Sequence, residues 1–387
     1  MVDVYYFTEM PYAAFDESEA ERYPSMRLTF PNTYFDAGTA HGLFRDYFDQ
    51  YQWAEEVGFD GLMINEHHNT PSCMDVAVNL SAAVLGRVTK RAKILLLGNM
   101  LPTTDNPVRL AEEVAMADVI SGGRIIAGVV RGIGIETWAN NNIPNHNRER
   151  FEECHDLMLA TWTRPGPFRW EGTHYHFRVI NPWVLPVQKP HPPIWVPGTG
   201  SPETIEWAAR LGYTYAAFLV PMDATVRLYD AYREHAANNG YEATSDNFAY
   251  MVCCVCADTD EEAQEIGRHY MWRMGHPLRG PVEYWAPPGY LGRRRPVRPH
   301  SGGAPRGGAP SGGRKPLHLL SYEELQEAYH LVVGSPQTVL EKLGHMRETL
   351  GFGSLLLEAQ AGAMPHKETM RSLELLGRDV IPELKKG

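Results

Sequence analysis

The sequence lacks any apolar run long enough to cross a membrane. A spanning helix needs about 20 consecutive apolar residues, and none of that length occurs in the 387 residues. The first ten residues, MVDVYYFTEM, lack the basic start and apolar core of a signal peptide. These absences predict a cytoplasmic protein with no membrane partner.

Cysteine is also scarce, with five residues at scattered positions. Cys253, Cys254 and Cys256 share one apolar run, MVCCVCA, without the paired spacing and nearby histidines of a metal site. We interpret them as buried free thiols, which suits a reducing cytoplasm. The formal net charge of −11 argues against nucleic acid as a partner.

What the sequence does contain is a repeating pattern of short strands and helices. The runs Ile94–Leu97 and Ile125–Val130 are rich in branched aliphatic residues, as are strands buried on both faces of a parallel sheet. Between them a helical pattern starts near Pro107 and ends at Ser-Gly-Gly, residues 121–123. This segment predicts a β-α-β unit.

The pattern recurs along the whole chain. We expect eight strands, at Val2–Phe7, Asp60–Asn65, Ile94–Leu97, Ile125–Val130, Ile194–Val196, Tyr213–Phe218, Phe248–Ala257 and Ser354–Glu358. Eight strands alternating with helices indicate an α/β fold, a (β/α)8 TIM barrel formed by residues 1–387 as one domain. A doubly wound open sheet is the alternative, but no G-x-G-x-x-G opens a helix after the first strand.

Two insertions interrupt the pattern. In residues 164–190, FRWEGTHYHF predicts a small hairpin that turns near Gly172, after the fourth helix. Residues 275–320, after the seventh strand, contain RRRPVRPHSGGAPRGGAPSGGRK, which has no acidic residue and too little apolar content for a core. We expect a mobile lid whose arginines cover an anion, or a solvated loop.

In a barrel of this kind, functional side chains lie at the C-terminal ends of the strands. His67 follows the second strand within Glu66-His67-His68, where an imidazole can act as a general base near neutral pH. A histidine held only by a loop hydrogen bond is the simpler alternative. No further acid or histidine cluster is expected at the other strand ends, so we predict no metal site here.

The ends of the fourth and fifth strands predict a phosphate site. Arg131 ends the fourth strand beside a glycine, and Gly198, Thr199 and Gly200 form a tight turn after the fifth. A helix starts at once behind this turn, and free N–H groups at a helix N-terminus bind anions. Ser201 and Thr204 can contact the same anion. An ion pair for Arg131 and ordinary capping by Ser201 are the alternatives.

Three segments resemble the bacterial luciferase family of flavin-dependent monooxygenases. They are the EHH at 66–68, LPTTDNPVRLAEEVAMADVISGGRIIAGVVRG and PHPPIWVPGTGSPETIEWAARLG. The resemblance implies a barrel that binds reduced FMN or, in one branch, a deazaflavin. It implies that His67 is catalytic, that the phosphate is held by Arg131, Ser201, Thr204 and the Gly200 amide, and that Asn99 lies on the strand supporting the flavin ring, often at a cis peptide.

The resemblance also implies a two-component monooxygenase. A separate flavin reductase would supply reduced FMN, and a flavin C4a-peroxide formed with O2 would oxygenate a small molecule. Aromatic residues of the first strand and its loop, among them Tyr5, Phe7 and Phe15, suggest an apolar or aromatic substrate. Family members favour homodimers through helices two and three. Val130 and Gly200 replace a cysteine and an acidic residue of luciferase, so we do not expect light emission.

Three other functions remain open. A deazaflavin-dependent dehydrogenase would share the barrel and the phosphate site but would transfer hydride without O2. A flavin-binding protein without enzymatic activity would share both as well. A metal hydrolase with a related fold is the third.

Overall fold

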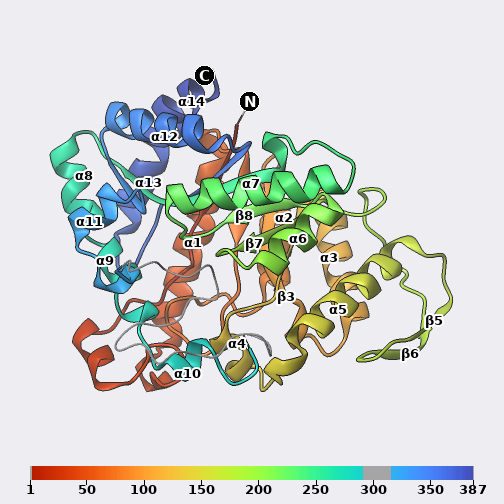
Figure 1. Ribbon diagram of the computed structural model, residues 1–387. Helices are drawn as coiled ribbons and strands as arrows, with labels where there is room; N and C mark the ends of the chain where they lie inside the picture. Colours follow the sequence, from red (N-terminus) through yellow and green to blue (C-terminus); the bar gives the residue numbers. More distant parts are fainter. Residues whose placement is uncertain (1, 291–314, 387) are drawn as a thin grey trace.

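Eight parallel strands close into a barrel, as the sequence predicted. The computed structural model describes residues 2–290 and 315–386 (Figure 1). In order around the ring the strands are β1 (Asp3–Phe7), β2 (Gly61–Ile64), β3 (Lys93–Met100), β4 (Ile125–Val130), β7 (Ile194–Gly198), β8 (Thr214–Ala217), β9 (Phe248–Cys256) and β11 (Ser354–Glu358). β11 pairs with β1 and completes the ring.

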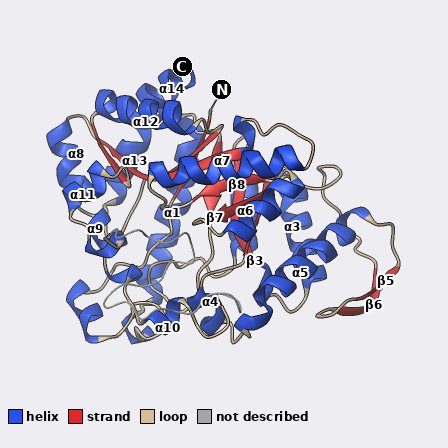
Figure 2. Cartoon of the chain, in the orientation of Figure 1, coloured by secondary structure: helices blue, strands red, loops and turns tan. Residues whose placement is uncertain are grey.

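Helices surround the strands, which lie inside them in Figure 2. They include α1 (Ala37–Val57), α2 (Val78–Val88), α3 (Pro107–Ser121), α5 (Asn147–Thr163), α6 (Pro202–Leu211), α7 (Met222–Asn238), α12 (Pro336–Leu350) and α13 (His366–Leu375). α1 begins six residues before the first residue of the apolar pattern in the sequence. The Asp36 carboxylate sets this start, since it accepts the Thr39 N–H at 2.7 Å and caps the helix.

Three elements differ from the sequence prediction. A short strand, β10 (Leu331–Gly334), was not predicted, and it pairs with the second half of β9 outside the ring. A short helix, α4 (Gly134–Ala139), follows β4. In place of the one helix that the alternating pattern implies after β9, the chain forms two, α8 (Asp260–Gly267) and α9 (Tyr270–Met274).

Both insertions lie where the sequence placed them. The hairpin of β5 (Phe168–Glu171) and β6 (His176–Ile180) stands away from the barrel in Figure 1. The second insertion follows α9 and includes α10 (Val282–Trp285), which packs so closely on α4 that a side chain at Gly134 would collide with the Trp285 carbonyl. Its residues 291–314, and with them the predicted role of their arginines, lie outside the described residues.

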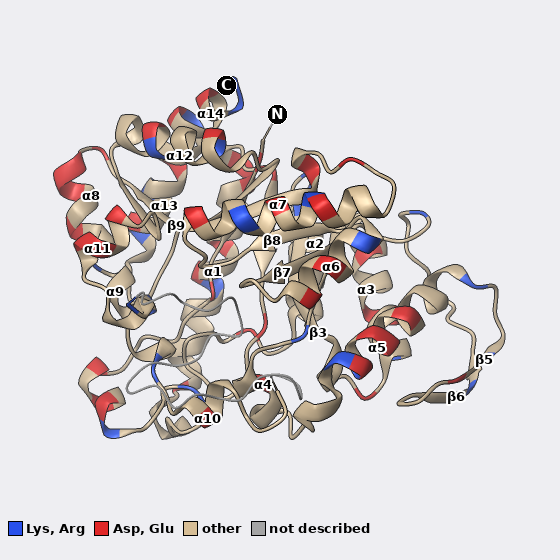
Figure 3. Cartoon of the chain, in the orientation of Figure 1, with Lys and Arg blue, Asp and Glu red and all other residues tan. Residues whose placement is uncertain are grey.

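The core has two layers, one inside the ring and one between strands and helices. The interior is filled by Tyr5, Phe7, Met63, Leu95, Leu97, Ile126, Trp195, Ala216, Ala249, Met251 and Leu356. All five cysteines are buried and unpaired, which confirms the prediction of free thiols. Acidic side chains gather on the outer helices α8 and α11 (Tyr322–Glu327) (Figure 3). Within the described ranges, no helix combines the length and apolar character that a membrane crossing needs.

Candidate active site at the strand ends

Two histidines after β2 share one buried carboxylate. His67 Nδ1 lies 2.7 Å from Glu136 Oε1, and His68 Nδ1 lies 3.3 Å from Glu136 Oε2. Glu136 belongs to α4, and its side chain is 1% exposed. The short helix that the sequence did not predict therefore delivers the partner of both imidazoles.

This arrangement selects the tautomer of the His67 ring. Burial raises the pKa of Glu136, but the hydrogen bonds from His67 and His68 outweigh it and lower that pKa to about 2. The carboxylate is ionised near neutral pH and can only accept, so His67 Nδ1 must carry a proton. The hydrogen bond to Glu136 is the main cause that raises the pKa of His68. Neutral His67 consequently keeps its lone pair on Nε2.

A buried ion network lies next to His67. His67 Nε2 is 3.9 Å from Glu9 Oε1, just beyond the end of β1. Arg273 of α9 binds the same Glu9 oxygen at 2.9 Å and the Glu358 Oε1 at the end of β11 at 2.7 Å. Burial opposes ionisation of Glu9, but nearby positive charge, first that of Arg273, lowers its pKa. The network thus keeps an anion close to the free nitrogen of His67.

Three acids that the sequence analysis did not single out surround this site. Glu9 follows β1, Glu358 ends β11, and Glu136 lies on α4. Glu358 gave a signal, since a carboxylate ends an otherwise apolar strand. Nothing in the sequence pointed to Glu136. Its role depends on contact with two histidines that lie 68 and 69 residues away in the chain.

The predicted phosphate residues meet at neighbouring strand ends. β4 pairs with β7 so that Gly128 lies opposite Trp195, which brings Arg131 and Gly198, each three residues later, to the same edge. Arg148 at the start of α5 joins them, with Nη2 at 3.4 Å from Thr204 Oγ1. Burial and then the charge of Arg131 lower the pKa of Arg148, so the two cations are close. The sequence analysis missed Arg148, because a charged side chain is common on any exposed helix and does not by itself indicate a site.

The start of α6 already holds an anion. Ser201 stands at the N-cap but does not make the capping hydrogen bond, and its hydroxyl donates to Glu203 Oε2 at 2.9 Å. The pKa of Glu203 is lowered first by its own backbone N–H, then by Ser201 and by the charges of Arg148 and Arg131. The Ser201 hydroxyl and the Glu203 amide thus contact this carboxylate, and two guanidinium groups add positive charge nearby. Ordinary capping by Ser201 is not observed.

The turn before α6 has the backbone that a close approach requires. Gly200 has a φ of 108°, a conformation that other residues rarely adopt. A side chain at Gly198 would lie 2.5 Å from the Tyr215 hydroxyl, so only glycine fits there. Thr199 lies between them, within the same turn.

Asn99 lies in β3, where the ladder to β4 shifts its register between Leu96 and Asn99. The peptide bond between Leu97 and Gly98 is cis, close to the place that the resemblance implied. The Asn99 side chain is buried, and its Nδ2 has no hydrogen-bond partner among the described residues. A buried amide donor without a partner is costly unless a ligand satisfies it.

The second insertion reaches the predicted phosphate residues. Tyr290 donates its hydroxyl to the Gly132 carbonyl at 2.7 Å, and the Arg131 guanidinium lies 5.1 Å from the centre of its ring. Trp138 Nε1 of α4 donates to the Glu283 carbonyl at 3.1 Å. The described beginning of this insertion therefore covers the end of β4.

The aromatic residues of the first strand do not form the expected wall. Tyr5 packs on Trp195 inside the ring and over Gly61, at the far end of the strands from His67. Phe15 packs at a tilt on Phe30, which stacks on Tyr34, within the loop that follows β1. Phe7 is closest to the site, since it ends β1 and contacts Phe218 after β8 at 6.4 Å between ring centres.

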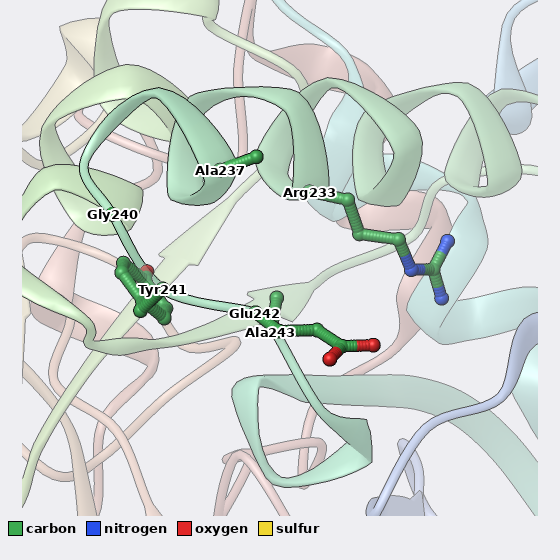
Figure 4. Close-up of a pocket in the computed structure, with 6 residues that line it drawn as sticks. All are labelled: Arg233, Ala237, Gly240, Tyr241, Glu242 and Ala243. Carbon is green, nitrogen blue, oxygen red and sulfur yellow. The ribbon is translucent and has the colours of Figure 1, made fainter.

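A separate hollow of about 500 Å³ opens at the other end of the barrel (Figure 4). It lies between the end of α7 and the start of β9, and is lined by Arg233, Ala237, Gly240, Tyr241, Glu242 and Ala243. None of the predicted site residues lines it.

Comparison with known proteins agrees with this geometry. The family model described as luciferase-like monooxygenase matches residues 28–352. The alkanal monooxygenase alpha chain of Photobacterium leiognathi is 26% identical over 220 residues, which cover 56% of this chain and 61% of that protein. The match therefore spans about three fifths of this curated relative.

Two solved structures share the whole fold. The oxygenating constituent of 3,6-diketocamphane monooxygenase from Pseudomonas putida, in complex with FMN, has a TM-score of 0.72 at 22% identity and covers 99% of this chain and 98% of its own. An F420-dependent secondary alcohol dehydrogenase has a TM-score of 0.68 at 14% identity and covers 99% of both chains. The fold is common to both enzymes, whereas the match over residues 28–352 assigns the family. The chain belongs to the luciferase-like monooxygenase family.

Proposed function

We propose that this protein is a monooxygenase that uses reduced FMN and O2 to oxygenate an apolar or aromatic small molecule. Membership of the family supports the oxidoreductase chemistry. One observation carries the phosphate-bearing flavin: Ser201 donates to Glu203 at the start of α6, and the charges of Arg148 and Arg131 act on that carboxylate. Such a donor set suits the phosphate of FMN.

The other predicted cofactor residues also fit a flavin. Gly200 has the left-handed backbone of a tight turn, Gly198 leaves room for Tyr215 beneath it, and Thr204 lies on the first turn of α6. The unsatisfied Asn99 amide offers a donor to a ring acceptor. When bound, reduced FMN would supply the electrons that activate O2.

His67 is the residue that we propose to handle the proton. Glu136 fixes its tautomer and leaves Nε2 free to accept a proton and return it. The partly exposed Phe218 after β8, which contacts the Phe7 ring, supports an apolar substrate. Glu9, 3.9 Å from Nε2, would stabilise the imidazolium once formed.

The proposal extends to partners and assembly. The relative from Pseudomonas putida is named as an oxygenating constituent, which supports a separate flavin reductase as partner. α2 and α3 pack side by side and expose apolar side chains, namely Leu80, Val84, Val88, Met116, Val119 and Ile120. We propose that these helices form a homodimer of one-domain barrels in the cytoplasm, and light scattering tests the dimer.

The test of the function has three outcomes. First, the purified protein is titrated with FMN, reduced FMN and a deazaflavin to measure binding. It is then incubated with reduced FMN, isotopically labelled O2 and a ketone or an aromatic compound to measure turnover. We expect one labelled oxygen atom in the product. Anaerobic oxidation of an alcohol with the deazaflavin would indicate a dehydrogenase. Tight flavin binding without turnover of any compound would indicate a protein that only binds flavin.

His67→Ala separates proton transfer from cofactor binding. We expect this variant to bind FMN as the parent does and to lose turnover by about a hundredfold or more. A near-normal rate would remove His67 from the proposed mechanism.

A further inference from the structure

Two histidines and a glutamate converge where the β5–β6 hairpin meets the start of α5. His146 Nδ1 lies 3.3 Å from Glu149 Oε2, and His174 Nε2 lies 3.2 Å from the same oxygen. All three atoms lie within 4.8 Å of one another. Within residues 2–290 and 315–386, no other group of three such side chains is this close. The cluster is separate from the site at the strand ends.

The distances suit two ligands of one tetrahedral ion as well as they suit hydrogen bonds. They lie at or just beyond the upper end of the N–H···O range of about 2.7–3.2 Å. Zinc bonds of about 2.0–2.1 Å at tetrahedral angles place neighbouring ligand atoms about 3.3–3.4 Å apart. Octahedral ligands at the same bond length would lie about 3.0 Å apart. Imidazole nitrogen with carboxylate oxygen is a ligand set that zinc accepts.

The hairpin turn that carries His174 is held firmly on α5. Glu153, one turn after Glu149, accepts the backbone N–H groups of Thr173, His174 and Tyr175 at 3.1, 2.8 and 3.1 Å. The His174 side chain is only 13% exposed. His146 and Glu149 are three residues apart at the helix start. The three ligands are thus positioned by contacts other than their own, which lowers the cost of ordering them around an ion.

We propose that His146, Glu149 and His174 bind one Zn²⁺ ion, with water as the fourth ligand. Glu149 and His146 are half exposed or more, so the open position faces solvent. A solvent-facing position on the outer side of α5 suits an ion that locks the hairpin to the helix. Zinc would therefore stabilise the insertion without taking part in the chemistry at His67.

The test measures zinc binding to the full chain, prepared without a histidine tag and stripped with a chelator. Calorimetric titration with zinc sulfate is expected to give one ion per chain. His174→Ala and Glu149→Gln should each weaken this binding by at least about tenfold, since even indirect partners of a metal contribute that much. His176→Ala, on the exposed strand β6 of the same hairpin, is the matched control and should bind as the parent does.

A second variant keeps the assignment unambiguous. His67→Ala must retain the zinc affinity of the parent, because His67 and His68 also face a carboxylate. Zinc should also slow hydrogen exchange of the amides at 173–175 in the parent but not in His174→Ala. The proposal would be overturned if the parent bound zinc no more tightly than a His146→Ala, His174→Ala double variant. Loss of zinc binding in His67→Ala alone would overturn it as well.

Discussion

The imidazole of His67 is joined to the carboxylate of Glu136 by a 2.7 Å hydrogen bond through Nδ1. This contact links the turn after β2 to the helix after β4, two segments that the barrel brings together. It defines which nitrogen of His67 is available to a substrate. The candidate site is therefore a property of a pair of residues rather than of the EHH motif alone.

Replacing Glu136 with glutamine tests this pairing. Glutamine cannot accept two hydrogen bonds from imidazoles through two equivalent oxygens, so the tautomer of His67 is no longer imposed. We expect turnover to fall by about tenfold or more while FMN affinity is unchanged. The pKa of His68 should also fall, because Glu136 is the main cause that raises it.

The rate is measured across pH, with His68 followed by NMR. Glu112→Gln, on the exposed face of α3, is the control. A Glu136→Gln protein with the parent's rate and pH profile would show that the contact only supports the fold.

Arg131→Ala tests the phosphate site. Loss of one charge-assisted hydrogen bond should weaken FMN binding by about 1.5–3 kcal/mol, which is about 10- to 150-fold in Kd. Riboflavin, which lacks the phosphate, should bind the variant and the parent equally. Arg109→Ala, an exposed arginine on α3 paired with Glu113, is the control variant. Equal losses for FMN and riboflavin would argue against a phosphate contact.

Glu203→Gln should have the opposite effect on FMN. In the structure this carboxylate occupies the donors that a phosphate would need, and its negative charge would repel the ligand. We expect FMN affinity to rise by at least about threefold, because the repulsion between the carboxylate and the phosphate is removed. Fluorescence titration measures it, with Glu206→Gln on the next turn of α6 as the matched control. Weaker binding in Glu203→Gln would mean that the carboxylate positions the site instead.

Glu66 makes the stability of the protein depend on pH. Burial is the main cause that raises its pKa from 4.5 to about 7, against the Val78 N–H and the charge of His68. The folded state holds this proton more tightly than the unfolded state does. Protonated Glu66 therefore contributes at most about 3 kcal/mol to the free energy of unfolding. This contribution is complete below about pH 4.5 and is lost as pH rises through about 7.

Glu66→Gln should flatten the fall in stability over this window. Denaturant unfolding at pH 5 and pH 8 measures the difference, and the nearby acids Asp75 and Glu136 remain unchanged. The exposed Glu56→Gln in α1 should keep the parent's pH dependence. A slope identical in Glu66→Gln and the parent would assign the effect to another group.

The strands could be predicted because burial on both faces leaves an apolar run in the sequence. β10 could not, since its four residues follow α11 closely and pair only with β9. Arg131 and Ser201 could be placed because the ends of β4 and β7 share one edge in any barrel of this topology. Glu136 and Arg148 could not, because their roles arise from contacts with distant segments.

The pairing of β10 with β9 has a consequence for the geometry of the ring. The two strands are parallel, and Leu331 at the start of β10 lies opposite Cys253, three residues before the end of β9. The chain thus leaves β9 and returns at β10 on one ladder. This ladder fixes both ends of the excursion between the two strands, so the ring keeps its geometry on either side of it.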